Sequence, residues 1–312
     1  MGMRRIAASV LIILGLVSSG ACGKKGSNGG KPRVAVSIFP LWDITHRIAG
    51  DRLDVVLILP PGKSEHGYDP TPKEIAKLEG CQLGITVGLD MDLWADQILK
   101  SSGGAKIVHL GDKVKTMPVA LEHVGDEEAH KGEAPGEDND PEVGAPDPHY
   151  WLDPTKMSGV ADQIAAELTT LDPAGKDTYA KNLDDVKKSL AELDGKIDAR
   201  AKAWTKRTIV TFHGSMSYYA ARYKLNVAAV IEPLAGKEPT PAYIGQVLSA
   251  IKATSAVALF SEPQFDRAPA ETIAREANIP LGELDPVGGI EGRDSYEKLL
   301  TWNTDHLEQL LK

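Results

Sequence analysis

The chain has 312 residues, a formal net charge of −9 at neutral pH, and only two cysteines. A chain this acidic is a poor partner for nucleic acid, whereas a cationic ligand is compatible with its charge. The length favours two lobes over a single core. Two cysteines cannot provide a disulfide framework, so the fold must be held together by its apolar core.

The N-terminal segment predicts export. Two arginines precede an apolar run over 6–17, and small residues follow it. This pattern is typical of a secretory signal peptide over 1–21, because the apolar run is too short for a membrane-spanning helix. Cys22 comes directly after the small residues and is expected to become the lipidated first residue, with unlipidated cleavage as the alternative. Residues 22–30 have the composition of a flexible tether. We therefore expect a membrane-anchored lipoprotein in the periplasm or at the cell surface.

Residues 31–172 are expected to form an N-terminal α/β lobe. Short apolar runs alternate with amphipathic segments, a pattern that predicts a mostly parallel sheet covered by helices. The predicted strands cover 33–39, 54–59, 82–87 and 106–110, and the predicted helices cover 41–49, 72–79, 92–101 and 155–171.

An acidic tract interrupts this lobe over 117–146. It contains nine carboxylates between Glu122 and Glu142, together with His123 and His130. Few apolar residues are available to anchor the tract, so we expect a mobile, exposed loop. Two interpretations stay open here: a surface insertion without function, or a weak collector of metal ions near a tighter site.

The segment 173–206 predicts one long helix, because apolar residues recur along it at steps of three and four. Residues 207–312 then repeat the α/β pattern as a C-terminal lobe. Its predicted strands cover 207–212, 227–231, 256–260 and 281–284, and its predicted helices cover 216–223, 241–253, 269–277 and 295–311. The predicted fold is therefore α/β, with two (β/α) lobes linked by one long rigid helix.

Four side chains suited to a divalent metal lie after predicted strands or in a turn stiffened by proline: His66, His149, His213 and Asp285. Ligands of parallel sheets bind at the carboxyl ends of the strands. Three imidazoles and one carboxylate are typical ligands of Zn²⁺. Spacing alone does not show that the four side chains converge, and each histidine on its own is equally well explained as a surface or packing residue. Glu262 is a candidate supporting carboxylate.

Five motifs carry a family resemblance over essentially the whole mature chain: PPGKSEHGYDPTPKEI at 60–75, DPHYWLDP at 147–154, TFHGSMSYYAARY at 211–223, FSEPQFD at 260–266 and LDPVGG at 284–289. In this order and spacing they resemble the metal-binding solute-binding proteins of ABC transporters, in the cluster that handles zinc, manganese and iron. The resemblance implies a metal site between the lobes. It also implies that His66, His149, His213 and Asp285 are the metal ligands.

The zinc members of the family are the most similar, because manganese members usually carry glutamate where this chain has His213. The resemblance thus implies capture of Zn²⁺, with Mn²⁺ as the alternative ion, and delivery to a membrane permease. We expect a monomer. We also expect no enzymatic activity, since four protein ligands would close the position that a zinc hydrolase keeps open for water. The alternatives are a manganese- or iron-binding member of the same family and a metal-dependent adhesin lipoprotein.

Overall fold

The computed structural model describes residues 30–119, 144–233 and 238–312, and the structural statements below refer to these residues. The N-terminal sheet has four parallel strands in the order β2-β1-β3-β4. Their bounds are β1 Arg33–Val36, β2 Asp54–Leu57, β3 Cys81–Thr86 and β4 Lys106–His109.

The C-terminal sheet repeats this arrangement with four parallel strands in the order β6-β5-β7-β8. Their bounds are β5 Thr208–Thr211, β6 Asn226–Val230, β7 Ala258–Ser261 and β8 Leu281–Glu283. The predicted pair of α/β lobes with mostly parallel sheets is confirmed. In both sheets the first strand in sequence lies between the second and the third, so the chain reverses its winding direction next to that strand, where α/β folds bind their ligands.

The helices lie between the strands, as the alternating pattern predicts. Those of the N-terminal half are α1 Phe39–Ala49, α2 Pro72–Ala76, α3 Leu93–Ser101 and α5 Pro154–Leu171. Those of the C-terminal half are α7 Ser217–Tyr223, α8 Pro241–Thr254, α9 Ala268–Ala277 and α10 Tyr296–Leu311. Short 3₁₀ turns cover Gly50–Arg52, Leu110–Lys113, Tyr150–Leu152, Pro173–Gly175 and Gly214–Met216.

Two helix boundaries differ from the sequence prediction for local reasons. Helix α1 begins at Phe39, before Pro40, because proline fits the first turn of a helix, where its missing N–H would have no partner. Helix α2 ends at Ala76, three residues earlier than expected. The chain turns there and passes through Gly80 at φ +77° before entering β3.

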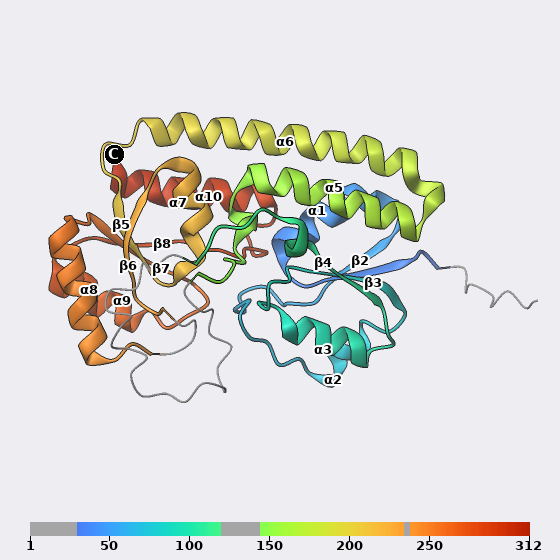
Figure 1. Ribbon diagram of the computed structural model, residues 1–312, viewed down its shortest axis with the longest axis horizontal. Coiled ribbons are helices and arrows are strands. Elements are labelled where there is room, and N and C mark those ends of the chain that lie inside the picture. Colours follow the sequence, from blue (N-terminus) through green and yellow to red (C-terminus); the bar gives the residue numbers. More distant parts are fainter. Residues whose placement is uncertain (1–29, 120–143, 234–237) are drawn as a thin grey trace, which may run out of the picture. The chain divides into compact units, whose positions relative to one another are not determined.

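The long helix α6 (Lys176–Lys202) joins the two halves of the described chain. It is about 40 Å long at 1.5 Å per residue. It packs against α1 and α5 near its beginning and against α7 and α10 near its end, as Figure 1 shows. Its buried apolar face belongs to one large core cluster that also contains Ile85 of β3 and Phe260 of β7. The two sheets therefore share a core through this helix.

No helix among the described residues is both long and apolar enough to cross a membrane. Cys81 is buried and forms no disulfide within the described residues. The predictions for the signal peptide, for Cys22 and for most of the acidic tract concern residues outside the described part of the chain: 1–29 and 120–143, the latter with His123 and His130.

Candidate metal centre

The loop that follows β2 carries His66. It opens with two prolines and Gly62, whose φ of +80° suits glycine, and it closes at α2, where Thr71 and Glu74 form a capping box. Trp94 of α3 donates its indole N–H to the carbonyl oxygen of Glu65 over 2.9 Å. This hydrogen bond from a side chain to the backbone fixes the loop next to His66.

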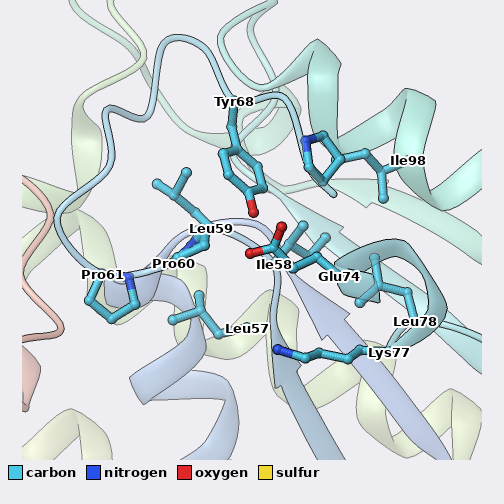
Figure 2. Close-up of a pocket in the computed structure, with 11 residues that line it drawn as sticks. Leu57, Ile58, Leu59, Pro60, Pro61, Tyr68, Glu74, Lys77, Leu78 and Ile98 are labelled. Carbon is cyan, nitrogen blue, oxygen red and sulfur yellow. The ribbon is translucent and has the colours of Figure 1, made fainter. Parts of the chain in front are cut away.

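A small cavity of about 220 Å³ lies between this loop and α2. Figure 2 shows Tyr68 reaching into it with its hydroxyl toward Glu74, beside Leu59 and Pro60, which follow β2. The Tyr68 ring also packs edge-on against Trp94, with ring centroids 5.5 Å apart. The lining of the cavity is mostly apolar and includes none of the predicted metal ligands. The cavity is thus separate from the metal centre and leaves space beneath the His66 loop.

His149 lies in a buried turn that is tied to both halves of the chain. Asp147 accepts hydrogen bonds from the backbone N–H and from Nδ1 of His149, each over 2.9 Å. Trp151, two residues on, is fully buried and donates to the carbonyl oxygen of Pro286 over 2.8 Å. Because a carboxylate can only accept, Nδ1 carries the proton and Nε2 presents a lone pair. The turn therefore holds His149 ready to bind a cation.

The acidic tract begins and ends beside this turn. The backbone N–H of Asp147 donates to the carbonyl oxygen of Met117 over 2.8 Å. The Tyr218 hydroxyl accepts from the N–H of Met117 and donates to the carbonyl oxygen of Asp147, both over 2.9 Å. Hydrogen bonds thus fix both ends of the tract beside Asp147, two residues before His149.

His213 follows β5 in extended backbone and is 3% exposed. Its Nδ1 lies 2.8 Å from Oε2 of Glu262, which follows β7, although the contact lacks the angles of a hydrogen bond. Burial is the main cause that lowers the pKa of His213 to about 4 and raises the pKa of Glu262 to about 8. The structure therefore places Glu262 against a predicted ligand, as the sequence suggested, at the point where the winding of the second sheet reverses.

The three histidines converge. Nε2 of His66 lies 3.2 Å from Nε2 of His149 and 3.2 Å from Nε2 of His213. Zn–N bonds of 2.0–2.1 Å at tetrahedral angles place two nitrogens about 3.3 Å apart. Burial and the two neighbouring imidazoles lower the pKa of His66 well below its usual value, so this ring is neutral. Burial is the largest influence on His149 and opposes its protonation, but the hydrogen bond to Asp147 and the charges of Asp147, Glu65 and Glu262 together raise its pKa.

Glu65 completes the cluster. One oxygen of its carboxylate and one nitrogen of each histidine all lie within 4.8 Å of one another. The side chain is fully buried, yet neither carboxylate oxygen forms a hydrogen bond within the described part of the chain. Burial raises the pKa of Glu65, although the neighbouring His213 and His149 oppose the shift. A buried carboxylate without a hydrogen-bond partner is costly unless a cation compensates it.

Asp285 lies outside this cluster of four ligand atoms. It is 1% exposed, and its Oδ1 accepts hydrogen bonds from Gln264 and from the backbone N–H groups of Val287 and Gly288. Its Oδ2 lies 3.0 Å from Nη1 of Arg293. The structure thus brings three of the four predicted ligands together and holds Asp285 in a separate network.

Sequence reasoning missed Glu65, although it directly precedes His66. Adjacent side chains point to opposite faces in a strand, but the loop after β2 has no such alternation, so neighbours can converge. An acidic residue beside a loop histidine, in a segment fixed by prolines at both ends, was the available signal.

Comparisons with known proteins identify the family of the chain. Residues 34–310 match the family described as zinc-uptake complex component A, periplasmic. The metal ABC transporter substrate-binding lipoprotein FimA of Streptococcus parasanguinis is 30% identical over 315 residues, covering 97% of this chain and 96% of its own. The manganese ABC transporter substrate-binding lipoprotein PsaA of Streptococcus pneumoniae is 28% identical over 314 residues, covering 97% and 96%.

Solved structures show the same fold. The crystal structure of ZnuA has a TM-score of 0.77 at 25% identity and covers 91% of this chain and 100% of its own. The binding protein FpvC of Pseudomonas aeruginosa, in complex with Mn²⁺, has a TM-score of 0.77 at 25% identity and covers 90% and 99%. The family match spans both sheets and every residue of the metal centre. The chain belongs to the family of periplasmic zinc-uptake complex component A.

Proposed function

We propose that this protein is the extracytoplasmic solute-binding component of an ABC transporter, which captures a divalent metal ion and delivers it to the membrane permease. The observation that carries the proposal is the convergence of three imidazole nitrogens on a buried carboxylate that has no hydrogen-bond partner among the described residues. Without a cation, this arrangement places nitrogen lone pairs and a carboxylate against one another in a buried site. Family membership supports the transport role.

We propose Zn²⁺ as the preferred ion and His66, His149 and His213 as three of its ligands. Nitrogen ligands at tetrahedral spacing suit Zn²⁺, whereas Mn²⁺ favours oxygen-rich, octahedral shells. Mn²⁺ is the second candidate because PsaA is named for manganese and FpvC was solved with Mn²⁺. The geometry favours Glu65 as the fourth ligand, and Asp285, which the family resemblance implies as a ligand, is the alternative.

A closed shell of this kind binds a metal ion rather than catalyses with it. A catalytic zinc site has three protein ligands and keeps the fourth position for water or substrate. Here four donor atoms lie within 4.8 Å of one another, and Glu65 is itself a candidate for the fourth position. We therefore propose a binding protein without enzymatic activity.

We further propose that the protein acts as a monomer, anchored outside the cytoplasmic membrane through a lipid on Cys22. FimA and PsaA carry the word lipoprotein in their names, and the sequence around Cys22 has the composition of a processing site. The anchor would keep the loaded protein near its permease.

Metal titration of the purified protein tests the proposal. We expect one tightly bound Zn²⁺ per chain and weaker binding of Mn²⁺ in competition. His149→Ala should weaken zinc binding by at least about a hundredfold, since it removes a ligand and not merely a supporting contact. His46→Ala is the matched control, because His46 is exposed on α1 and stacks on Trp42. Equal binding by both variants, or hydrolytic turnover by the zinc-loaded protein, would overturn the proposal.

A further inference from the structure

Asp285 is a buried carboxylate in a fixed position. Its Oδ1 accepts from Nε2 of Gln264 over 2.8 Å, from Val287 over 2.9 Å and from Gly288 over 3.0 Å. Gly288 has a φ of +72°, a backbone conformation that favours glycine. All three N–H groups donate to Oδ1, so Oδ2 is the carboxylate oxygen that remains available to a cation.

Arg293 lies against that second oxygen. Its Nη1 is 3.0 Å from Oδ2 of Asp285, and its guanidinium stacks over the Trp302 ring at 4.1 Å. The Arg293 side chain is buried, but its Nε and Nη1 lack hydrogen bonds of normal geometry to residues 30–119, 144–233 and 238–312. The contact with Asp285 is therefore a short ion pair rather than a bidentate hydrogen bond. Glu283 is the other carboxylate near this guanidinium, with Oε1 at 3.9 Å from Nη1.

The pair is adjacent to the metal centre on two sides. Gln264, which donates to Asp285, belongs to the same short segment as Glu262, the residue that contacts His213. Trp151, whose ring packs against His149 with centroids 5.2 Å apart, donates to the carbonyl oxygen of Pro286. Asp285 thus directly precedes Pro286, which contacts the His149 turn. Its second carboxylate oxygen, Oδ2, is nevertheless paired with Arg293.

We propose that Arg293 determines metal specificity by holding the Asp285 carboxylate out of the coordination shell. This inference rests on the proposed function with Glu65, not Asp285, as the fourth ligand. With Asp285 withheld, the shell closes on three imidazoles and Glu65, which suits Zn²⁺. Release of Asp285 would add an oxygen ligand and favour ions that accept larger, oxygen-rich shells, such as Mn²⁺.

The test compares Zn²⁺ and Mn²⁺ affinities of the wild type, Arg293→Met and Arg293→Lys by competition titration. We expect Arg293→Met to shift the affinity ratio toward Mn²⁺ by about tenfold or more. Lysine keeps the positive charge beside Asp285, so Arg293→Lys should stay near the wild-type ratio. The shift should disappear in Arg293→Met/Asp285→Asn, because an amide oxygen is a weaker ligand than a carboxylate. An unchanged ratio in folded Arg293→Met would overturn the proposal.

Cobalt substitution gives a readout that a merely structural role for Arg293 would not change. Four-coordinate Co²⁺ absorbs visible light much more strongly than five- or six-coordinate Co²⁺. We expect the intense spectrum for the wild type and a weaker one for Arg293→Met, with the double variant restored.

Asp285→Asn alone keeps the proposal testable if Arg293→Met does not fold. The asparagine oxygen can still accept the three N–H groups, so this variant should fold. We expect its metal ratio and cobalt spectrum to match the wild type, and a loss of zinc affinity would show that Asp285 is a ligand with Arg293 in place. Failure of the wild type to bind one metal ion tightly would instead sink the proposed function, and that outcome is visible before any variant is made.

Discussion

Replacement of Glu65 by methionine should have opposite effects on the metal-free and the zinc-loaded protein. The Glu65 carboxylate is fully buried and has no hydrogen-bond partner in the part of the chain that the structure describes, so in the metal-free protein it destabilises the fold. Removal of an unsatisfied buried polar group gains about 1–3 kcal/mol, and more when the group is charged. Methionine has a similar length and is apolar, so Glu65→Met should raise the free energy of unfolding of the metal-free protein by this amount.

Zinc binding should offset this gain in the stability of Glu65→Met. Loss of one of four ligands should raise the zinc dissociation constant by at least about a hundredfold, given that loss of a supporting contact alone costs 10–100-fold. At a fixed zinc concentration well above the dissociation constant, a hundredfold loss of affinity removes about 2.7 kcal/mol of zinc-induced stabilisation. The gain and the loss are of similar size, so the zinc-loaded variant should be no more stable than the wild type.

Thermal unfolding with chelator and with excess Zn²⁺, combined with zinc titration, measures both effects. Glu79→Met is the matched control, because Glu79 is exposed in the same half of the chain. It should change neither the metal-free stability by more than about 0.5 kcal/mol nor the zinc affinity. If Glu65→Met destabilises the metal-free protein and leaves zinc affinity intact, Glu65 is a structural residue and the cluster has no fourth ligand there.

Three further changes probe the surroundings of the site and the stability of the fold. Asp147→Ala removes the acceptor that orients His149 and should weaken zinc binding by about 10–100-fold in chelator competition, without loss of the one-to-one stoichiometry. His213→Glu exchanges a nitrogen ligand for an oxygen ligand and should move the preference from Zn²⁺ toward Mn²⁺ in competition titration; an unchanged preference would contradict the role of His213. Burial raises the pKa of Asp43, so its charged form destabilises the fold at neutral pH, and this penalty disappears as pH falls through the raised pKa. Asp43→Asn, which can still accept from the Tyr296 N–H, should therefore be at least as stable at pH 7 in thermal unfolding, with the difference shrinking in acid.

The architecture was accessible from the sequence because its signals are local. Apolar runs that end at proline, glycine or polar residues place strands such as β2 within two residues of their observed ends. The three- and four-residue spacing of leucine, valine and isoleucine along α6 predicted its buried face. The order of strands within each sheet was not accessible, because it depends on pairings between segments far apart in the chain.

The metal centre was only partly accessible, for a physical reason. The histidines stand at strand ends, where the fold gathers ligands, but their convergence depends on turns such as the one that Asp147 fixes around His149. Asp285 is paired with Arg293, which lies eight residues further on, beyond three glycines at positive φ. Nothing in the spacing of these residues indicates that the guanidinium folds back onto the carboxylate.

The shared core limits how the ion can leave, and this leads to a prediction for Trp94. Apolar residues of both sheets and of α6 form one buried cluster, so wide separation of the two halves would expose it at about 25 cal/mol per Å². Movement of the His66 loop is less costly, because the cavity beside α2 gives it space and Trp94 fixes it through one hydrogen bond. Trp94→Phe removes that bond, which contributes about 0.5–1.5 kcal/mol, and should speed zinc dissociation roughly twofold to tenfold in stopped-flow chelation. Trp42→Phe, which removes a similar bond to Val55 away from the site, should leave the rate unchanged. Equal rates for both variants would mean that the ion leaves by a route other than movement of the His66 loop.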